Sequence, residues 1–134
     1  MQTIIPYLAY EDAPAALTFL HEAFGFEERF RLPMPDGRIG HAEVALGDSV
    51  LFLASLWKDV GHMSPKDLPG VHCQIYCHVD DVDAHFLRAR EAGATVINEP
   101  SEAHGERTYR AMDPEGHRWI FGSPLVESGH ANQS

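Results

Sequence analysis

Apolar and polar residues follow one another along the chain in an order that occurs twice. In the first half, residues 3–10 suit a short strand. Apolar residues at helical spacing then lie between Asp12, which suits a helix N-cap, and Gly25, which suits a helix stop. Extended runs with turns between them follow at 27–32, 39–46 and 50–56.

The second half repeats this order, which predicts a duplicated strand–helix–three-strand unit. A strand is expected at 71–79, a helix between Asp81 and Gly93, and further strands at 95–98, 107–112 and 118–121. The spacing from Gly25 to Asp48 equals that from Gly93 to Gly116, at 23 positions each. We expect an α+β domain spanning 1–134, in which two βαβββ modules form a curved, open mixed sheet with helices on one face. Its expected parts are module one at about 3–57, a linker at 58–70, module two at about 71–124 and a flexible tail at 125–134.

The segment 71–79 alternates most regularly between apolar and polar residues. Val71, Cys73, Ile75, Cys77 and Val79 occupy one set of positions, and His72, Gln74, Tyr76 and His78 occupy the other. Because successive side chains of a strand point to opposite faces, one face of the sheet would meet helices and the other water or a ligand. An open, curved face of this kind predicts a ligand cleft, although a flat solvated face or one covered by a partner subunit gives the same pattern.

Composition narrows the class of protein. The chain has 134 residues, of which 44% are hydrophobic and 22% charged, as expected for one globular domain rather than a disordered chain. No apolar run approaches the roughly 20 residues that cross a bilayer, and the start of the chain lacks a basic signal region. These features predict a cytoplasmic protein with no membrane partner.

The net charge of −10 argues against nucleic-acid binding, since an acidic surface repels phosphates and no basic cluster is present in the sequence. It would favour a cationic small molecule, although acidity also serves solubility. Cys73 and Cys77 would lie about 13 Å apart on one strand, too far for a disulfide. Both are expected to be small buried residues in a reducing compartment.

Several motifs resemble the vicinal oxygen chelate superfamily, which contains glyoxalase I, bleomycin resistance proteins and extradiol dioxygenases. The likeness covers roughly residues 3–124. It is carried by 10–20 with 23–26, Met34-Pro35-Asp36-Gly37, Gly40–Glu43, Gly47–Ser49, Gly105–Arg110 and Asp113–Trp119. The resemblance implies paired βαβββ modules and usually a homodimer, but it does not settle the function because this fold hosts several chemistries.

Metal-dependent members of the superfamily place a His or Glu ligand on the first and last strand of each module. Transferred to this chain, those positions are Ile5, Phe52, Gln74 and Ile120. Three are apolar and one is a neutral amide, so they make a poor site for a divalent metal. No metal or other cofactor is expected. A site made of His41, Glu43 and His72 remains open if neighbouring strands align these side chains.

The sequence therefore predicts a member of the metal-free, bleomycin-resistance-like branch, which binds a small organic molecule, cationic or aromatic, by affinity alone. Antibiotic resistance by sequestration is the function that this resemblance implies. No catalytic residue is assigned, and a non-enzymatic role is favoured. A metal-dependent lyase, isomerase or dioxygenase, or a dimeric interaction module without a ligand, remain alternatives. A His41–Glu43 acid/base pair is also open. The expected ligand-binding residues are Ile5, Tyr7, His41, Glu43, Phe52, Trp57, His72, Gln74, Tyr76, Tyr109 and Ile120.

Overall fold

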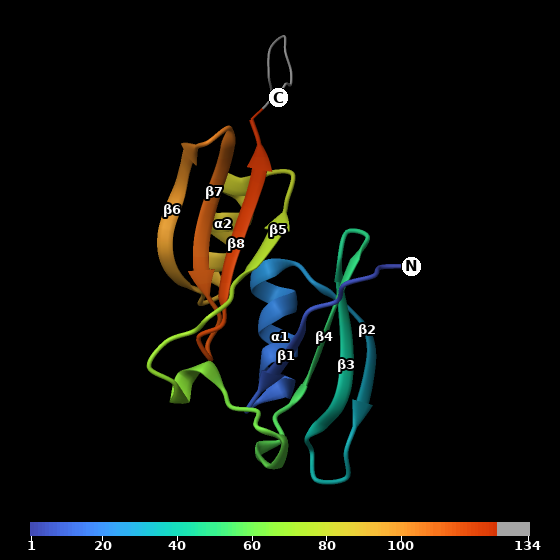
Figure 1. Cartoon of the computed structure of the whole chain (residues 1–134). Coiled ribbons are helices and arrows are strands. Elements are labelled where there is room, and N and C mark those ends of the chain that lie inside the picture. Colours follow the sequence, from blue (N-terminus) through green and yellow to red (C-terminus); the bar gives the residue numbers. More distant parts are fainter. Residues whose placement is uncertain (126–134) are drawn as a thin grey trace.

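Two βαβββ modules make up the fold in a computed structural model, which describes residues 1–125 (Figure 1). Residues 126–134 lie outside the described residues, and so does nearly all of the expected tail at 125–134. The strands form two separate four-stranded mixed sheets, with orders β1-β4-β3-β2 and β5-β8-β7-β6. The α+β class and the two modules are as predicted, with two sheets in place of one continuous sheet.

The first module contains β1 (Tyr7–Tyr10), α1 (Ala13–Phe24), β2 (Glu27–Pro33), β3 (Ile39–Leu46) and β4 (Ser49–Ser55). The Asp12 carboxylate accepts a hydrogen bond from the Ala15 amide at 3.1 Å, so the predicted N-cap is confirmed. The helix ends at Gly25, which adopts the left-handed conformation with a φ of 83°. Since β1 pairs in parallel with β4, the helix crosses over one face of the sheet.

The second module contains β5 (Ile75–His78), α2 (Val82–Glu91), β6 (Thr95–Ala103), β7 (Glu106–Met112) and β8 (Arg118–Pro124). The Asp81 carboxylate caps α2 by accepting from the Ala84 amide at 3.0 Å. Between the modules, the linker contains two short 3₁₀ helices, η1 (Lys58–Val60) and η2 (Pro65–Asp67). Among the described residues, no helix is long and apolar enough to cross a membrane.

Four strands differ in length from the prediction by more than one residue, and pairing explains two of the differences; β8 continues to Pro124 rather than ending at residue 121. β5 begins at Ile75 rather than at residue 71, because Ile75 pairs with Trp119 and β8 starts only one residue earlier. Residues 71–74 therefore have no partner strand on β8. β6 extends to Ala103 because it continues, past irregularities in register, to a turn at His104 and Gly105. β1 begins at Tyr7 rather than at residue 3.

The hydrophobic core lies between the helices and the faces of the sheets that they cover. Trp119, Tyr10, Tyr109, Phe24 and Phe121 are the largest fully buried side chains. Phe24 of α1 packs against Trp119 and Phe121 of β8, with ring centroids 5.3 and 4.7 Å away. The two modules thus share one core, which fixes the relative position of their sheets.

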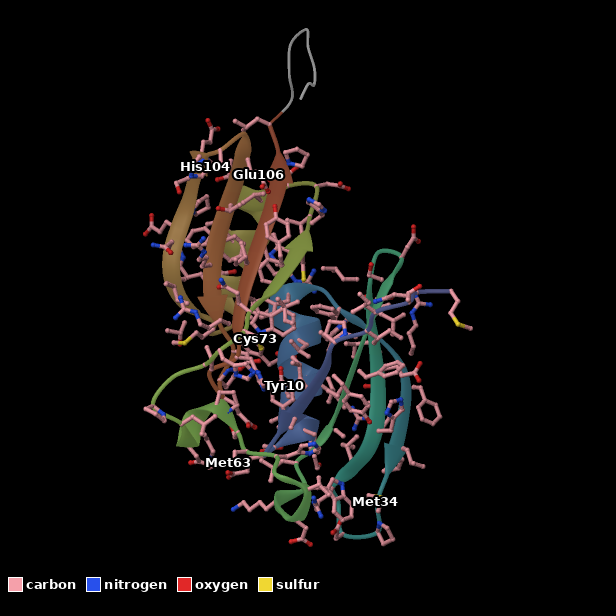
Figure 2. The ribbon with its side chains drawn as sticks, viewed as in Figure 1. Tyr10, Met34, Met63, Cys73, His104 and Glu106 are labelled. Atoms are coloured by element: carbon pink, nitrogen blue, oxygen red, sulfur yellow. The ribbon has the colours of Figure 1, made fainter. Side chains whose placement is uncertain are left out.

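The turn between β7 and β8 docks onto the first module through two buried carboxylates. Glu115 accepts hydrogen bonds from the amides of Glu11 at 2.8 Å and Asp12 at 2.7 Å, and from the Ser64 hydroxyl of the linker at 2.5 Å. Asp113 accepts from the Tyr10 hydroxyl at 2.6 Å. Burial and the adjacent Asp113 raise the pKa of Tyr10, so its phenol stays protonated as the donor. In Figure 2, Tyr10 lies near the centre of the molecule, beside α1.

A second contact joins the two helices. The Arg88 guanidinium of α2 donates to the backbone oxygens of His21 at 2.7 Å and Glu22 at 2.9 Å, near the end of α1. His85 of α2 lies 2.8 Å from the Phe24 oxygen through Nε2 and 2.5 Å from the Tyr109 hydroxyl through Nδ1. Burial lowers the pKa of His85, which favours its neutral form between these partners.

Candidate functional site

Each sheet has one face that its helix does not cover. We call these the first open face, on β1–β4, and the second open face, on β5–β8. On the first, the expected alternation is confirmed in β3: Ala42 and Val44 are buried toward the helix, and His41 and Glu43 are half-buried on the other side. Strand pairing brings six side chains together there: Tyr7, Phe30, Leu32, His41, Glu43 and Phe52.

A chain of hydrogen bonds crosses the first open face from β1 to β3. The Tyr7 hydroxyl lies 2.7 Å from His41 Nδ1, and His41 Nε2 lies 3.0 Å from a carboxylate oxygen of Glu43. Partial burial and the negative charge of Glu43 raise the pKa of Tyr7. The Tyr7 phenol is therefore protonated at neutral pH, and 55% of this residue is exposed. The three residues form one connected polar group on an accessible surface.

Aromatic rings surround this polar chain. The Phe52 ring meets Tyr7 and His41 edge to face, with centroid distances of 5.5 and 4.7 Å. Phe30 lies 6.1 Å from His41 and is 47% exposed, and its neighbour on the same strand and face, Leu32, is 49% exposed. Such an arrangement presents apolar ring surface beside a carboxylate, which suits an aromatic ligand with a polar or positive group.

The second open face has a different character. Tyr76 on β5 hydrogen-bonds the Glu106 carboxylate on β7, and its ring lies over Gly122, where an added methyl group would come within 2.5 Å of the phenol oxygen. His78 packs edge to face against Tyr76, with ring centroids 5.1 Å apart. Arg110 is exposed on the same face, opposite Ile120. This face therefore carries both a cationic side chain, Arg110, and the Glu106 carboxylate that Tyr76 engages, whereas the first carries Glu43.

The four positions that correspond to superfamily metal ligands do not fit a metal ion. Ile5, Phe52 and Ile120 have no donor atom, and Gln74 is an exposed amide that lies before β5 rather than on it. Across residues 1–125, no group of three or more His, Cys, Asp and Glu side chains is placed to hold a metal. The trio of His41, Glu43 and His72 is therefore not assembled in this structure.

The structure brings together some of the predicted ligand-binding residues and separates others. Tyr7, His41, Glu43 and Phe52 cluster on the first open face, whereas Ile5 lies before β1 and outside the strand. Tyr76 and Ile120 lie on the second open face, although Ile120 is only 9% exposed. Trp57 lies outside both, at the start of η1, where the Arg38 guanidinium stacks on its ring at 5.0 Å.

Three expectations about placement are wrong. Tyr109 does not lie on an open face: it pairs with Phe121, shares its helix-facing side and is fully buried. His72 does not lie on a strand, because residues 71–74 lack a partner. Cys73 is exposed rather than buried for the same reason, whereas Cys77 is half-buried and burial raises the pKa of its thiol to about 12. Figure 2 places Cys73 where the linker approaches the second sheet.

Two residues of the first open face were not predicted from the sequence. Phe30 and Leu32 alternate with Arg29 and Arg31 on β2, a signal that marks one apolar side of the strand. Pairing places Phe30 opposite Glu43 and Leu32 opposite His41. Their exposure makes them part of the candidate site.

A cavity of about 490 Å³ separates the two modules near β1 and β5. Its walls include Ile4 and Pro6 before β1, the turn at Gly47 and Asp48, and residues of β5. Gln2 closes one side by hydrogen-bonding both the amide and the carbonyl of Val50. Tyr76 and His78 of the second open face are among its walls, whereas the six side chains named on the first open face are not.

Comparisons with known proteins agree with the fold. Residues 4–121 match the family described as the Glyoxalase/Bleomycin resistance protein/Dioxygenase superfamily. An uncharacterized protein of Mycobacterium tuberculosis strain H37Rv, Rv0887c, is 37% identical over 129 residues, which cover 91% of this chain and 74% of that protein. The chain belongs to the glyoxalase/bleomycin resistance protein/dioxygenase superfamily.

Solved structures show the same fold. TioX from Micromonospora sp. ML1 has a TM-score of 0.73 and 30% identity, over 94% of this chain and 98% of TioX. A glyoxalase/bleomycin resistance protein from Streptomyces sp. CB03234 has a TM-score of 0.69 and 25% identity, over 91% of this chain and all of its own. These proteins share the architecture in which the open faces occur.

Proposed function

We propose that this protein binds a small organic molecule with an aromatic body on the first open face, without using a metal ion. The observation that carries the proposal is the ring cluster of Phe30, His41 and Phe52 beside Glu43, in which Phe30 is exposed and the other two rings are half-buried. A surface of this kind buries an aromatic ring and orients it through a few polar groups. Superfamily membership supports a small-molecule site but leaves its chemistry open.

A cationic ligand suits this face better than an anionic one. Glu43 supplies a carboxylate beside the rings, and the whole chain carries a net charge of −10, which attracts cations to its surface. Binding alone would then be the function, in the manner of a protein that sequesters a drug or toxic metabolite. No proton transfer or bond cleavage is needed for such a role.

We further propose that two copies of the chain form a homodimer in which the first open face of one copy faces the second open face of the other across the ligand-binding space. Phe30 and Leu32 leave about half of their surface exposed, which is costly for a monomer in water. Glu43 lies opposite Phe52 in the first sheet, and Arg110 lies opposite Ile120 at the corresponding place in the second. Arg110 could therefore pair with Glu43 of another copy, while the Glu106 carboxylate on the second open face is engaged by Tyr76. Sedimentation velocity tests this, and a monomer at micromolar concentration would contradict it.

Thermal-shift and calorimetric titration test the binding proposal. Cationic glycopeptides and aromatic amines should raise Tm and release or take up heat, whereas aromatic carboxylates should not. Phe30→Ala should weaken binding about fivefold by removing one ring contact. Leu87→Ala on α2, which removes a similarly exposed apolar side chain, serves as the control. Binding that is equally strong for cations and anions, or unaffected by Phe30→Ala, would contradict the proposal.

Elemental analysis of the purified protein separates this function from a metal-dependent lyase, isomerase or dioxygenase. Because the ligand positions Ile5, Phe52, Gln74 and Ile120 are unsuited to a metal, we expect substoichiometric metal and an affinity for aromatic amines that chelators leave unchanged. One equivalent of zinc, nickel, manganese or iron per chain would overturn the proposal in favour of a metal enzyme.

A further inference from the structure

We infer that the Tyr7–His41–Glu43 chain makes the first open face a hydrogen-bond acceptor, which selects ligands that donate an N–H or O–H group. The favoured class is an aromatic primary or secondary ammonium, rather than a quaternary ammonium of equal charge or a ketone. This inference rests on the proposed function, and it adds a direction to the polar contact that charge alone does not give.

Glu43 determines the direction of the hydrogen bonds that link Tyr7, His41 and Glu43. An ionised carboxylate has only acceptor oxygens, so the atom 3.0 Å from it, His41 Nε2, must carry the hydrogen. A neutral imidazole carries one ring hydrogen, which here is the one on Nε2. The other ring nitrogen, Nδ1, then presents a lone pair. Glu43 therefore fixes which tautomer of His41 is present.

The same reasoning extends to Tyr7. Since His41 Nδ1 has a lone pair and no hydrogen, the Tyr7 hydroxyl at 2.7 Å must donate to it. The only hydrogen of the phenol is thereby used inside the protein. What Tyr7 leaves for a ligand is its oxygen lone pairs, on a residue that is 55% exposed. The face thus presents an acceptor whose negative end is reinforced through two hydrogen bonds by a carboxylate.

The rings beside this acceptor strengthen its selectivity. Phe52 and Phe30 pack against Tyr7 or His41 and have no hydrogen-bonding group of their own. A ligand ring placed on them would displace water from the Tyr7 oxygen. A ligand donor then restores the lost hydrogen bond, whereas a ligand acceptor at that place leaves two acceptors facing each other.

Glu43→Gln should release this constraint without changing the shape of the side chain. A glutamine amide can donate to His41 Nε2, which shifts the imidazole hydrogen to Nδ1 and turns the Tyr7 hydroxyl outward as a donor. The variant should therefore accept ligands that the wild type rejects. Glu91→Gln, which removes an equal charge from an exposed position on α2, controls for net charge.

Three naphthalene probes test the inference by calorimetry at pH 8. They are 2-(1-naphthyl)ethylammonium, its N,N,N-trimethyl analogue and 1-naphthylacetone, which share a ring but present a charged donor, a charge without a donor, and an acceptor. We expect the wild type and Glu91→Gln to bind the ammonium about tenfold more tightly than the trimethyl analogue. In Tyr7→Phe this ratio should fall to about one, and Glu43→Gln should bind the ketone about fivefold more tightly than the wild type does.

The outcomes separate this inference from the proposed function. If the wild type binds the two cations equally, the inference is overturned but aromatic binding stands. If the tenfold preference for the ammonium persists in Tyr7→Phe, the inference is likewise overturned, because the larger size of the trimethyl group would then explain the preference. No binding of any probe would overturn both. Each ratio is measured within one folded variant, checked by circular dichroism, so a general loss of stability does not imitate the result.

Discussion

The buried carboxylate of Glu115 should hold the two modules and the linker together, and Glu115→Gln tests this role. In the wild type, one carboxylate oxygen accepts from the Glu11 amide and the Ser64 hydroxyl, and the other accepts from the Asp12 amide. The residue is 8% exposed, so water cannot replace a lost partner. A glutamine keeps the shape but offers one acceptor oxygen and one donor nitrogen in place of two acceptors.

The expected loss in the free energy of unfolding follows from the number of acceptors that the glutamine lacks. One partly buried backbone N–H loses its acceptor, at about 1–3 kcal/mol, and the remaining hydrogen bonds lose the assistance of the charge. We expect Glu115→Gln to lower the free energy of unfolding by about 2–4 kcal/mol, which corresponds to a fall in Tm of roughly 6–15 °C for a chain of this size. Ser64→Ala, which removes a single donor, should cost about 1 kcal/mol.

Urea denaturation followed by circular dichroism measures both variants, with Glu91→Gln as a surface control expected within about 0.5 kcal/mol of the wild type. Limited proteolysis adds a local readout, because a linker released from Glu115 should be cut faster between residues 58 and 70. The reasoning would be refuted if Glu115→Gln cost no more than Ser64→Ala, since the two backbone contacts would then contribute nothing.

Further predictions concern His85, the cysteines and Gly122. Burial lowers the pKa of His85 in the folded state, so the unfolded chain binds more protons and stability should fall as pH drops below about 6.5; in urea titrations, His85→Gln should reduce this fall, and an unchanged pH profile would refute it. In the folded protein, Cys73 should react promptly with a thiol reagent while Cys77, whose pKa burial raises to about 12, should react only on unfolding; two fast thiols would contradict this. Gly122→Ala should lower stability by about 1–2 kcal/mol, because the added methyl group would come within 2.5 Å of the Tyr76 hydroxyl and 2.7 Å of Thr108 Cγ2; Tyr76→Phe in the double variant should recover part of this loss, and a Gly122→Ala variant as stable as the wild type would refute the prediction.

Sequence periodicity was sufficient to predict the modules because each helix carries its own cap and stop. Asp12 and Asp81 cap their helices as expected, and the repeated spacing identifies the duplication. Sheet pairing was harder to predict, because it depends on contacts between distant residues. β8 begins at Arg118, and residues 71–74 are therefore left without a partner strand. Nothing in the alternation at 71–79 reveals this.

The candidate site was predictable only in part for the same reason. His41 and Glu43 alternate on one strand, so their common face could be inferred from β3 alone. Tyr109 was misplaced because its strand mixes polar and apolar residues on both faces, and only its pairing with Phe121 shows which way it points. The hydrogen bond from Tyr7 to His41 joins residues 34 positions apart and depends on side-chain conformations that periodicity does not determine.

The two modules contain corresponding turns, but these turns contact the other module differently. The turn of the second module at Asp113–Gly116 is fastened to the first by buried carboxylates. The corresponding turn of the first module, at Gly47 and Asp48, borders a cavity of about 490 Å³ instead. The junction at Asp113–Gly116 is thus held by hydrogen bonds, whereas the junction at Gly47 and Asp48 has empty space beside it. A small change in the angle between the two sheets would leave Glu115 in place and change the width of the cavity beside β1 and β5.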